Sequence, residues 1–376
     1  MPAEFGVVYP LWDFAADEGR LLERVAGEVG IEHLTIPVVT GAQTHFRLGS
    51  TAEAPHFHTE GGWHYRVSTK AYAGVALRPA KARWVTGADA LAQVRARAAA
   101  LNVRLLLRVD VRTVRALVDQ ERHLSQRNAW GQEVPFAGGC PCNPELRELL
   151  RATLDDLRRY EPAGYELVDW APDTAADRAA ARPLGWHQAV RRLLDVCFCA
   201  SCRQIAEREG IDPEQAARSV RVRVERLLAT PGGETTPDED DPVVAAYVAA
   251  RAADCCQWLQ RLAEGDSERR RFLVRTFGEP PLGNCAPWVR LTRLPAGYCG
   301  PLDGPVWTGR LQALPEISAL ALPVWRPTFG EAAELVRLVS EAAQAGVSTF
   351  DFEGLGEGAA DAVTWLKQAV RFARRA

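Results

Sequence analysis

Short apolar runs typical of β-strands alternate with amphipathic helical patterns along almost the whole chain. Strands that are buried on both faces appear as continuous apolar runs, and successive parallel strands need a crossover connection, usually a helix. We expect strands at residues 4–12, 33–39, 103–111, 164–170, 287–294, 317–325 and 348–354. We expect helices at roughly residues 16–29, 87–101, 144–160, 186–230, 241–275, 330–345 and 358–374. The alternation therefore predicts an α/β fold with a parallel sheet.

The number of alternations favours one architecture. Seven visible units in a chain of 376 residues are typical of a (β/α)8 TIM barrel, with an eighth strand near "RRFLVRTFG", residues 270–278. A doubly wound open sheet is the alternative, but no glycine-rich turn of the dinucleotide-binding type follows the first strand. About half of the residues are apolar, enough to bury one large core or two ordinary ones. We expect one barrel domain covering residues 1–376.

Charge and hydropathy narrow the classes of partner. The formal net charge of −3, from 45 basic and 48 acidic residues, leaves no excess that would attract nucleic acid or an anionic membrane. Residues 1–12 lack the pattern of a signal peptide, and no run approaches the ~20 apolar residues of a membrane span. We therefore expect a soluble, cytoplasmic protein with a small-molecule, sugar or peptide partner. The oligomeric state is left open, a homo-oligomer included.

Two long segments follow the expected second and third strands. They cover residues 40–86 and 112–143, and both leave the carboxyl ends of their strands. In a barrel this is the face on which binding sites are built, so these segments are expected to form the walls of a site. A third segment, residues 195–240, is expected to be a helical insertion.

The stretch "CFCASC" places Cys197, Cys199 and Cys202 within six positions. Thiolates spaced C-x-C-x-x-C can turn toward one ion, and zinc accepts four sulfurs in a tetrahedron. Cys140 in "CPCNP" is the best candidate for the fourth ligand, and Cys142 is the alternative. A four-sulfur site has no open position, so such a zinc would be structural. The competing interpretation is a cluster of ordinary buried cysteines.

These residues carry a resemblance. "CPCNPELRELL" followed by "CFCASCRQIAEREGID" resembles the zinc cluster of the β-galactosidases of glycoside hydrolase family 42. The longer run from "RNAWGQEVPFAGG" through "YELVDW" to "CFCASCR" is similar to a group of uncharacterised bacterial glycosidase-like barrel proteins. The resemblance covers roughly residues 100–215. It implies a (β/α)8 barrel and makes Cys140, Cys197, Cys199 and Cys202 the zinc ligands.

The catalytic pair of that family does not carry over. Its members have an acid/base glutamate after an asparagine at the end of strand four and a glutamate nucleophile at the end of strand seven. Here strand four ends "LVDWAPD", with Asp169 and Trp170 at those positions, and the next-to-last visible strand ends "LPVWRP" without a carboxylate. A glycosidase needs two carboxyl groups about 5–5.5 Å apart for retention or about 6.5–9.5 Å apart for inversion.

Carboxylates at other strand ends can fill this role. The candidates are Asp169, which occupies the acid/base segment, and Asp351 and Glu353, which share one face of the last strand. A helix cap or an ion pair is the competing interpretation for each of them.

Aromatic and polar residues near strand ends are expected to bind the sugar. Flat aromatic faces stack on sugar rings, although packing of loops against the rim is an equal alternative. The candidates are Trp12, Trp63, His64, Asp110, Trp170, Trp186, His187 and Trp325.

A second ligand set, His56, His58, Glu60 and His64, would suit a catalytic metal. Three functions follow from these observations: a glycosidase with a relocated acid pair, a noncatalytic carbohydrate-binding barrel, and a metalloenzyme that uses the loop histidines. The first is favoured.

Overall fold

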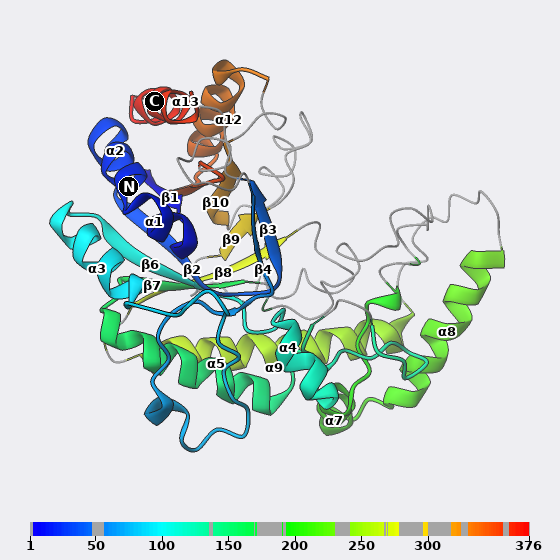
Figure 1. The fold of residues 1–376 in the computed structure, drawn as a ribbon. Coiled ribbons are helices and arrows are strands. Elements are labelled where there is room, and N and C mark those ends of the chain that lie inside the picture. Colours follow the sequence, from blue (N-terminus) through cyan, green and yellow to red (C-terminus); the bar gives the residue numbers. More distant parts are fainter. Residues whose placement is uncertain are drawn as a thin grey trace.

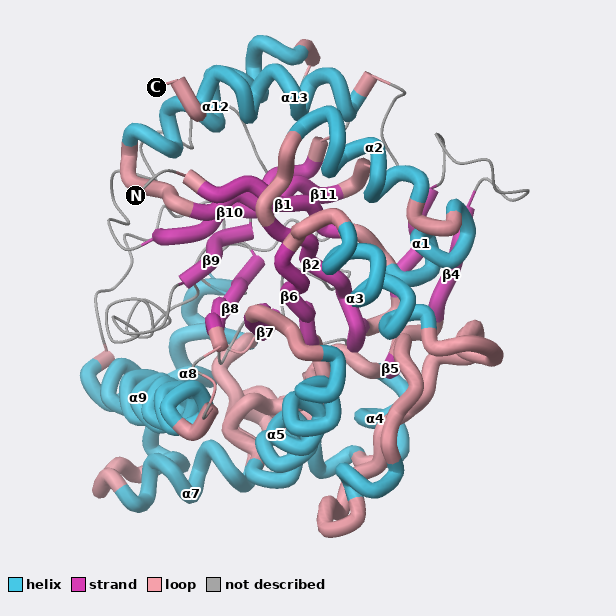
Figure 2. The backbone as a smooth tube through the Cα atoms, turned by 90° about the vertical axis from the view of Figure 1, so that its left-hand side faces the viewer, coloured by secondary structure: helices cyan, strands magenta, loops and turns pink. Residues whose placement is uncertain are grey.

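The computed structural model describes residues 3–46, 56–134, 138–168, 170, 190, 193–229, 241–266, 268, 270–277, 296–299, 317–324, 330–355 and 361–375. Within these residues, parallel strands form one curled sheet at the centre, with helices packed around its outside (Figure 2). The α/β class and the parallel sheet predicted from the sequence are confirmed.

The parallel ladder follows the order of the chain. Each strand pairs with the next, and the last strand also pairs with the first. This sequential order differs from the reversed order of a doubly wound sheet. A two-residue strand, β5 (Gly62–Trp63), adds to β2 in the antiparallel sense. The parallel strands are β1 (Glu4–Val8), β2 (His33–Thr40), β6 (Arg104–Val109), β7 (Gly164–Val168), β8 (Arg271–Phe277), β9 (Ala296–Cys299), β10 (Ile317–Pro323) and β11 (Thr349–Glu353).

Some elements differ from the sequence expectation in their bounds or in their presence. The strand expected near "RRFLVRTFG" is present as β8, but the helix expected over 241–275 is wrong in its last part, since α9 ends at Glu264. β9 was not expected, and the expected strand 287–294 lies outside the described residues. The segment 40–86 is also more regular than expected, because β3 (Gln43–Phe46) and β4 (His56–Thr59) pair as an antiparallel hairpin.

Glycines divide two of the expected helices. The helix expected at 16–29 is broken at Glu18 and Gly19, which have positive φ values of 56° and 81°, and the one expected at 186–230 is broken near Gly210, with φ 74°. Glycine adopts this conformation without the steric cost that a side chain brings. The main helices are α1 (Leu11–Asp17), α2 (Arg20–Val29), α3 (Ala90–Ala100), α4 (Arg115–Gln120), α5 (Pro144–Leu157), α7 (Ala200–Arg208), α8 (Pro213–Ala229), α9 (Pro242–Glu264), α12 (Ala332–Gln344) and α13 (Ala362–Ala373).

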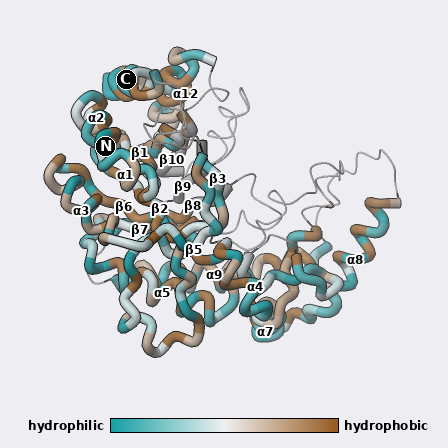
Figure 3. Tube along the Cα trace, viewed as in Figure 1, coloured by the Kyte–Doolittle hydropathy of each residue, from teal (hydrophilic) through white to brown (hydrophobic). Residues whose placement is uncertain are grey.

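Buried apolar residues form two clusters. The larger one joins the strands to the helices around them, and Figure 3 shows that hydrophilic and hydrophobic residues alternate along these helices. The smaller one joins α7, α8 and α9 to the four cysteines singled out above, and α8 extends away from the sheet (Figure 1). None of the described helices combines the length and the hydropathy needed to span a bilayer.

Because Gly6 has no side chain, two polar side chains from the strands on either side of it can meet inside the curl of the sheet. Gly6 of β1 is in register with Asp351 of β11 on one side and with His33 of β2 on the other. His33 Nε2 lies 2.9 Å from Asp351 Oδ1, and Thr35 donates to the same oxygen at 2.9 Å. All three side chains are buried, so these bonds join the second strand, β2, to the last strand, β11, through the interior.

We therefore predict that Gly6→Ala destabilises the protein. A Cβ atom at this position would overlap the His33 ring, which Asp351 holds in place, and overpacking of this kind costs about 1–3 kcal/mol. Gly27→Ala is the matched control, because nothing lies within 4 Å of its Cβ and alanine favours a helix. Urea unfolding measures both variants. Equal stability of the two would contradict this account of Gly6.

Candidate functional site

A cavity of about 830 Å3 opens at the carboxyl ends of the parallel strands. Its lining includes Val8 at the end of β1, Thr40 at the end of β2, Val168 at the end of β7 and Glu353 at the end of β11. The β3–β4 hairpin adds His45 to the wall. The long segments after β2 and after β6 both border this cavity.

The side chain of Glu353, at the end of the last strand β11, brings a carboxylate to this cavity. Its Oε1 lies 2.6 Å from Arg108 Nη2, and the Arg108 Nε lies 3.2 Å from Oε2 of Glu166 on β7. Glu166 is fully buried, whereas the Glu353 side chain is 23% exposed. One guanidinium on β6 thus connects a buried carboxylate to a carboxylate that faces the cavity.

Asp110 and Asp13 also line the cavity. Asp110 accepts hydrogen bonds from the backbone N–H of Thr113 at 3.3 Å and from its hydroxyl at 2.6 Å. These bonds fix the first turn after β6. Asp110 is therefore at the predicted face, and part of its hydrogen-bonding capacity is used by its own loop.

Asp351 lies deeper than the cavity. Its carboxylate is fully buried, bonds to His33 and Thr35, and is absent from the cavity lining. The two candidate carboxylates of β11 thus share a face, as predicted, but they have different surroundings.

Several predicted site residues fall outside the described residues: Asp169, Trp186, His187 and Trp325. Val168, which precedes Asp169, is described and lines the cavity.

The described tryptophans among the candidates are at most 2% exposed and do not line the cavity. Trp12 stacks on Phe57 with ring centroids 5.3 Å apart. Trp170 stacks on Trp258 at the same separation of 5.3 Å. Trp63 donates its indole N–H to Thr153 Oγ1 at 3.3 Å. Their contacts match the alternative considered from the sequence, in which loops pack against the rim.

His64 is bound through both ring nitrogens. Trp84 donates its indole N–H to Nδ1 at 2.9 Å, so Nε2 carries the proton and donates to Thr40 Oγ1 at 2.8 Å. Burial, with a smaller contribution from His45, lowers the pKa of His64 to about 3. The imidazole is therefore neutral and linked to the second strand.

The loop histidines do not assemble the second metal site considered above. His58 and Thr44 are bonded at 2.9 Å and Glu60 pairs with Arg83 at 3.0 Å, while His64 has no nitrogen left for a metal. Among the described residues, the groups of three or more His, Cys, Asp or Glu side chains close enough to bind one metal ion consist of cysteines alone. The structure therefore does not bring His56, His58, Glu60 and His64 together as one group of metal ligands.

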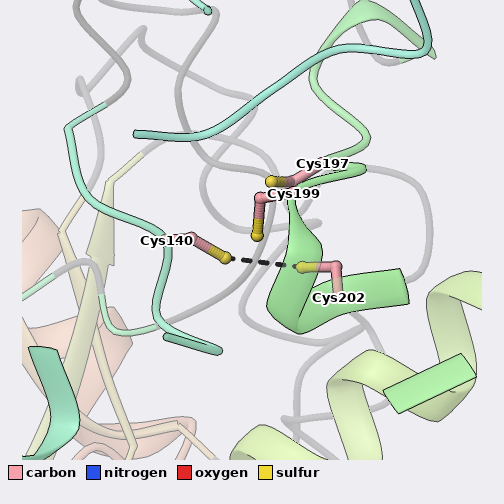
Figure 4. Close-up of side chains that lie close together, drawn as sticks. All are labelled: Cys140, Cys197, Cys199 and Cys202. Carbon is pink, nitrogen blue, oxygen red and sulfur yellow. Dashed lines mark hydrogen bonds between the residues drawn. The ribbon is translucent and has the colours of Figure 1, made fainter. Parts of the chain in front are cut away.

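Four buried cysteines converge between the loop before α5 and the start of α7 (Figure 4). The ligand atoms of Cys140, Cys197, Cys199 and Cys202 lie within 4.8 Å of one another, and the Sγ atoms of Cys140 and Cys202 are 3.4 Å apart. Four sulfurs about 2.3 Å from a tetrahedral zinc would be roughly 3.8 Å apart, so the spacing fits a metal ion. Cys142 is also buried but is outside this group of four.

Neighbouring groups stabilise negative sulfur. The backbone N–H of Arg127 donates to Cys197 Sγ at 3.4 Å. Cys199 is the N-cap of α7 and Cys202 lies in its first turn, where the helix dipole favours negative charge. Together with the sulfur spacing, these contacts mean that the site could bind a metal ion.

Neither Arg108 nor Glu166 was among the site residues predicted from the sequence. Each is a charged residue inside an otherwise apolar strand, in "VRLLLRVDV" and "YELVDW". A charge in such a position needs a partner when it is buried, and that requirement is the signal that could have found the pair.

We predict that His64 makes the protein less stable as the pH falls. The imidazole takes up a proton near pH 6.5 in the unfolded chain but only near pH 3 in the native protein. The free energy of unfolding should therefore decrease by about 1.4 kcal/mol per pH unit from pH 6.5 toward pH 3 through this residue alone. Urea unfolding at pH 7 and pH 5 measures the change, and His64→Gln should show a smaller decrease. An unchanged pH dependence in His64→Gln would contradict the assignment.

The sequence matches no protein-family model and no curated protein, whereas the fold is similar to that of two solved β-galactosidases and of SrfJ. A β-galactosidase from Bacillus circulans sp. alkalophilus has a TM-score of 0.55 and 12% identity over 98% of this chain and 55% of its own. A β-galactosidase from Rahnella sp. R3 has a TM-score of 0.56 and 8% identity over 99% and 56%. SrfJ from Salmonella typhimurium has a TM-score of 0.50 and 12% identity over 99% and 74%. The chain spans about half the length of the two β-galactosidases, and the similarity shows that it shares their fold.

Proposed function

We propose that the chain is a single-domain (β/α)8 barrel of the glycoside-hydrolase type that binds and hydrolyses a glycoside in the cavity described above. The observation that carries this proposal is the carboxylate of Glu353, held at the carboxyl-end cavity by Arg108. The carboxyl end of a barrel is where catalytic residues are found in this fold. The cavity volume of about 830 Å3 is within the range of small-molecule sites.

Glu353 and Asp169 form the proposed catalytic pair. Glu353 is ion-paired with Arg108, and this suits a carboxylate that acts as nucleophile or base. Asp169 follows directly after Val168, which lines the cavity, and it is assigned to protonate the leaving oxygen. Asp351 is assigned to support the strand, because its carboxylate is occupied by His33 and Thr35.

The sugar would be held mainly by polar side chains. Asp13, His45 and Asp110 line the cavity and supply hydrogen-bonding groups for hydroxyls. Trp186, His187 and Trp325 remain proposed sugar contacts on the basis of their positions in the sequence. Trp12, Trp63, His64 and Trp170 would support the walls instead.

The four cysteines are proposed to hold a structural zinc. Zinc is favoured because four thiolates at tetrahedral spacing are typical of it, and such a site leaves no position for substrate. The metal would join the loop before α5 to the helical insertion, whose apolar cluster surrounds the sulfurs.

We predict that Glu353→Gln and Asp169→Asn each reduce turnover of the best substrate from a panel of aryl and natural glycosides. Loss of an acid/base group typically costs about 100- to 10,000-fold in rate. Glu60→Gln is the matched control, because Glu60 is exposed and pairs with Arg83 on the surface.

Two results would change this conclusion. Full activity in Glu353→Gln would remove that residue from the chemistry. Absence of turnover on every glycoside, together with a thermal shift on addition of a sugar, would identify the noncatalytic carbohydrate-binding barrel as the correct function.

We also predict that the protein binds one tightly held zinc and that Cys199→Ser loses it, with a lower melting temperature. Removal of one thiolate opens the tetrahedral site and leaves a buried, charged cluster without its cation. Native mass spectrometry and elemental analysis measure the metal. Cys142→Ser is the control and should keep the zinc, and loss of zinc from that variant instead would exchange the roles of Cys140 and Cys142.

A further inference from the structure

Three charged side chains from three different strands meet inside the curled sheet. Two of these strands pair with each other, and the third pairs with neither. Arg108 comes from β6, Glu166 from the neighbouring β7, and Glu353 from β11 on another part of the sheet. Because β6 and β11 are not neighbours, the contact between Arg108 and Glu353 crosses the interior. It is therefore a tertiary contact and not a ladder contact between adjacent strands.

The Arg108 guanidinium contacts the two carboxylates through different nitrogen atoms. Nε faces Glu166 at 3.2 Å, while Nη2 faces Glu353 at 2.6 Å. A planar guanidinium that is held at one edge has a fixed direction for its remaining N–H groups, which an ammonium group lacks. Arg108 is 11% exposed and Glu166 is fully buried, so solvent screens the Arg108–Glu166 pair weakly.

We infer that Arg108 is a positioning residue that fixes the Glu353 carboxylate at the cavity, and that buried Glu166 holds Arg108 in place. Glu166 does not line the cavity, so it acts on the site through Arg108 and does not touch the sugar. This inference rests on the proposed function, because it assigns a role in the same site.

Variants of Arg108 test the inference through kcat. Arg108→Gln should lower kcat by about 100-fold, with little change in KM, because a small misplacement of a reacting group has an effect of this size. Arg108→Lys keeps the positive charge but lacks the forked N–H groups of the guanidinium, so its kcat should lie between those of the native protein and Arg108→Gln. Arg104→Gln is the matched control, since Arg104 is on the same strand but pairs with Glu4 and is 48% exposed. It should keep the native kcat.

A double-mutant comparison separates positioning from a general structural effect. If Arg108 acts through Glu353, Arg108→Gln should change the residual kcat of Glu353→Gln by less than about 3-fold, because residues that act as a unit are non-additive. An equal loss in both backgrounds, or native kcat in Arg108→Gln, would overturn the inference.

Two further measurements keep the test decisive. Arg108→Gln removes the guanidinium from beside the buried Glu166 carboxylate, so the variant Arg108→Gln with Glu166→Gln, which removes both charges, is measured if the single variant does not fold. Crystal structures of native protein and variant show whether the Glu353 carboxylate moves. If native protein turns over no glycoside, the proposed function fails, whereas an unmoved Glu353 carboxylate in the variant contradicts the inference itself.

Discussion

The bond between His33 and Asp351 is the interaction on which the arrangement of the site depends. It joins β2 to β11 over the bare backbone of Gly6, and β1 pairs with both of these strands. Parallel pairing alone aligns neighbouring strands, but this buried bond also fixes their side chains within the interior. Since β11 carries Glu353 two residues after Asp351, the same bond sets the position from which Glu353 reaches the cavity.

The interior of the sheet contains paired charges where barrel interiors are usually filled with branched apolar residues. Arg108 is ion-paired with the buried Glu166 and with Glu353 near the cavity. Buried ion pairs add little net stability, because desolvation offsets their attraction. Their consequence here is specificity of position, since the Arg108 guanidinium contacts one carboxylate from β7 and one from β11.

The two candidate centres depend on different parts of the fold. The cavity depends on strand ends and on the loops that follow β2 and β6, whereas the cysteine site belongs to a smaller apolar cluster with α7, α8 and α9. The loop after β6 connects them, because it contributes Thr113 and Gly138 to the cavity and Cys140 to the sulfurs. A metal ion at the cysteines would therefore stabilise one wall of the cavity from outside while taking no part in its chemistry.

The sequence by itself determined the alternation of strands and helices, and it named the four cysteines of the cluster, with Cys142 as the alternative to Cys140, because these are patterns of local spacing and chain order. It also placed Glu353 and Asp351 on one face. Only the tertiary structure decided that Glu353 reaches the cavity while Asp351 bonds to His33, and that the tryptophans of the described loops are packed inside. The physical reason is that an ion pair such as Arg108 with Glu353 joins residues 245 positions apart, and no local pattern records which distant strand will face a given side chain.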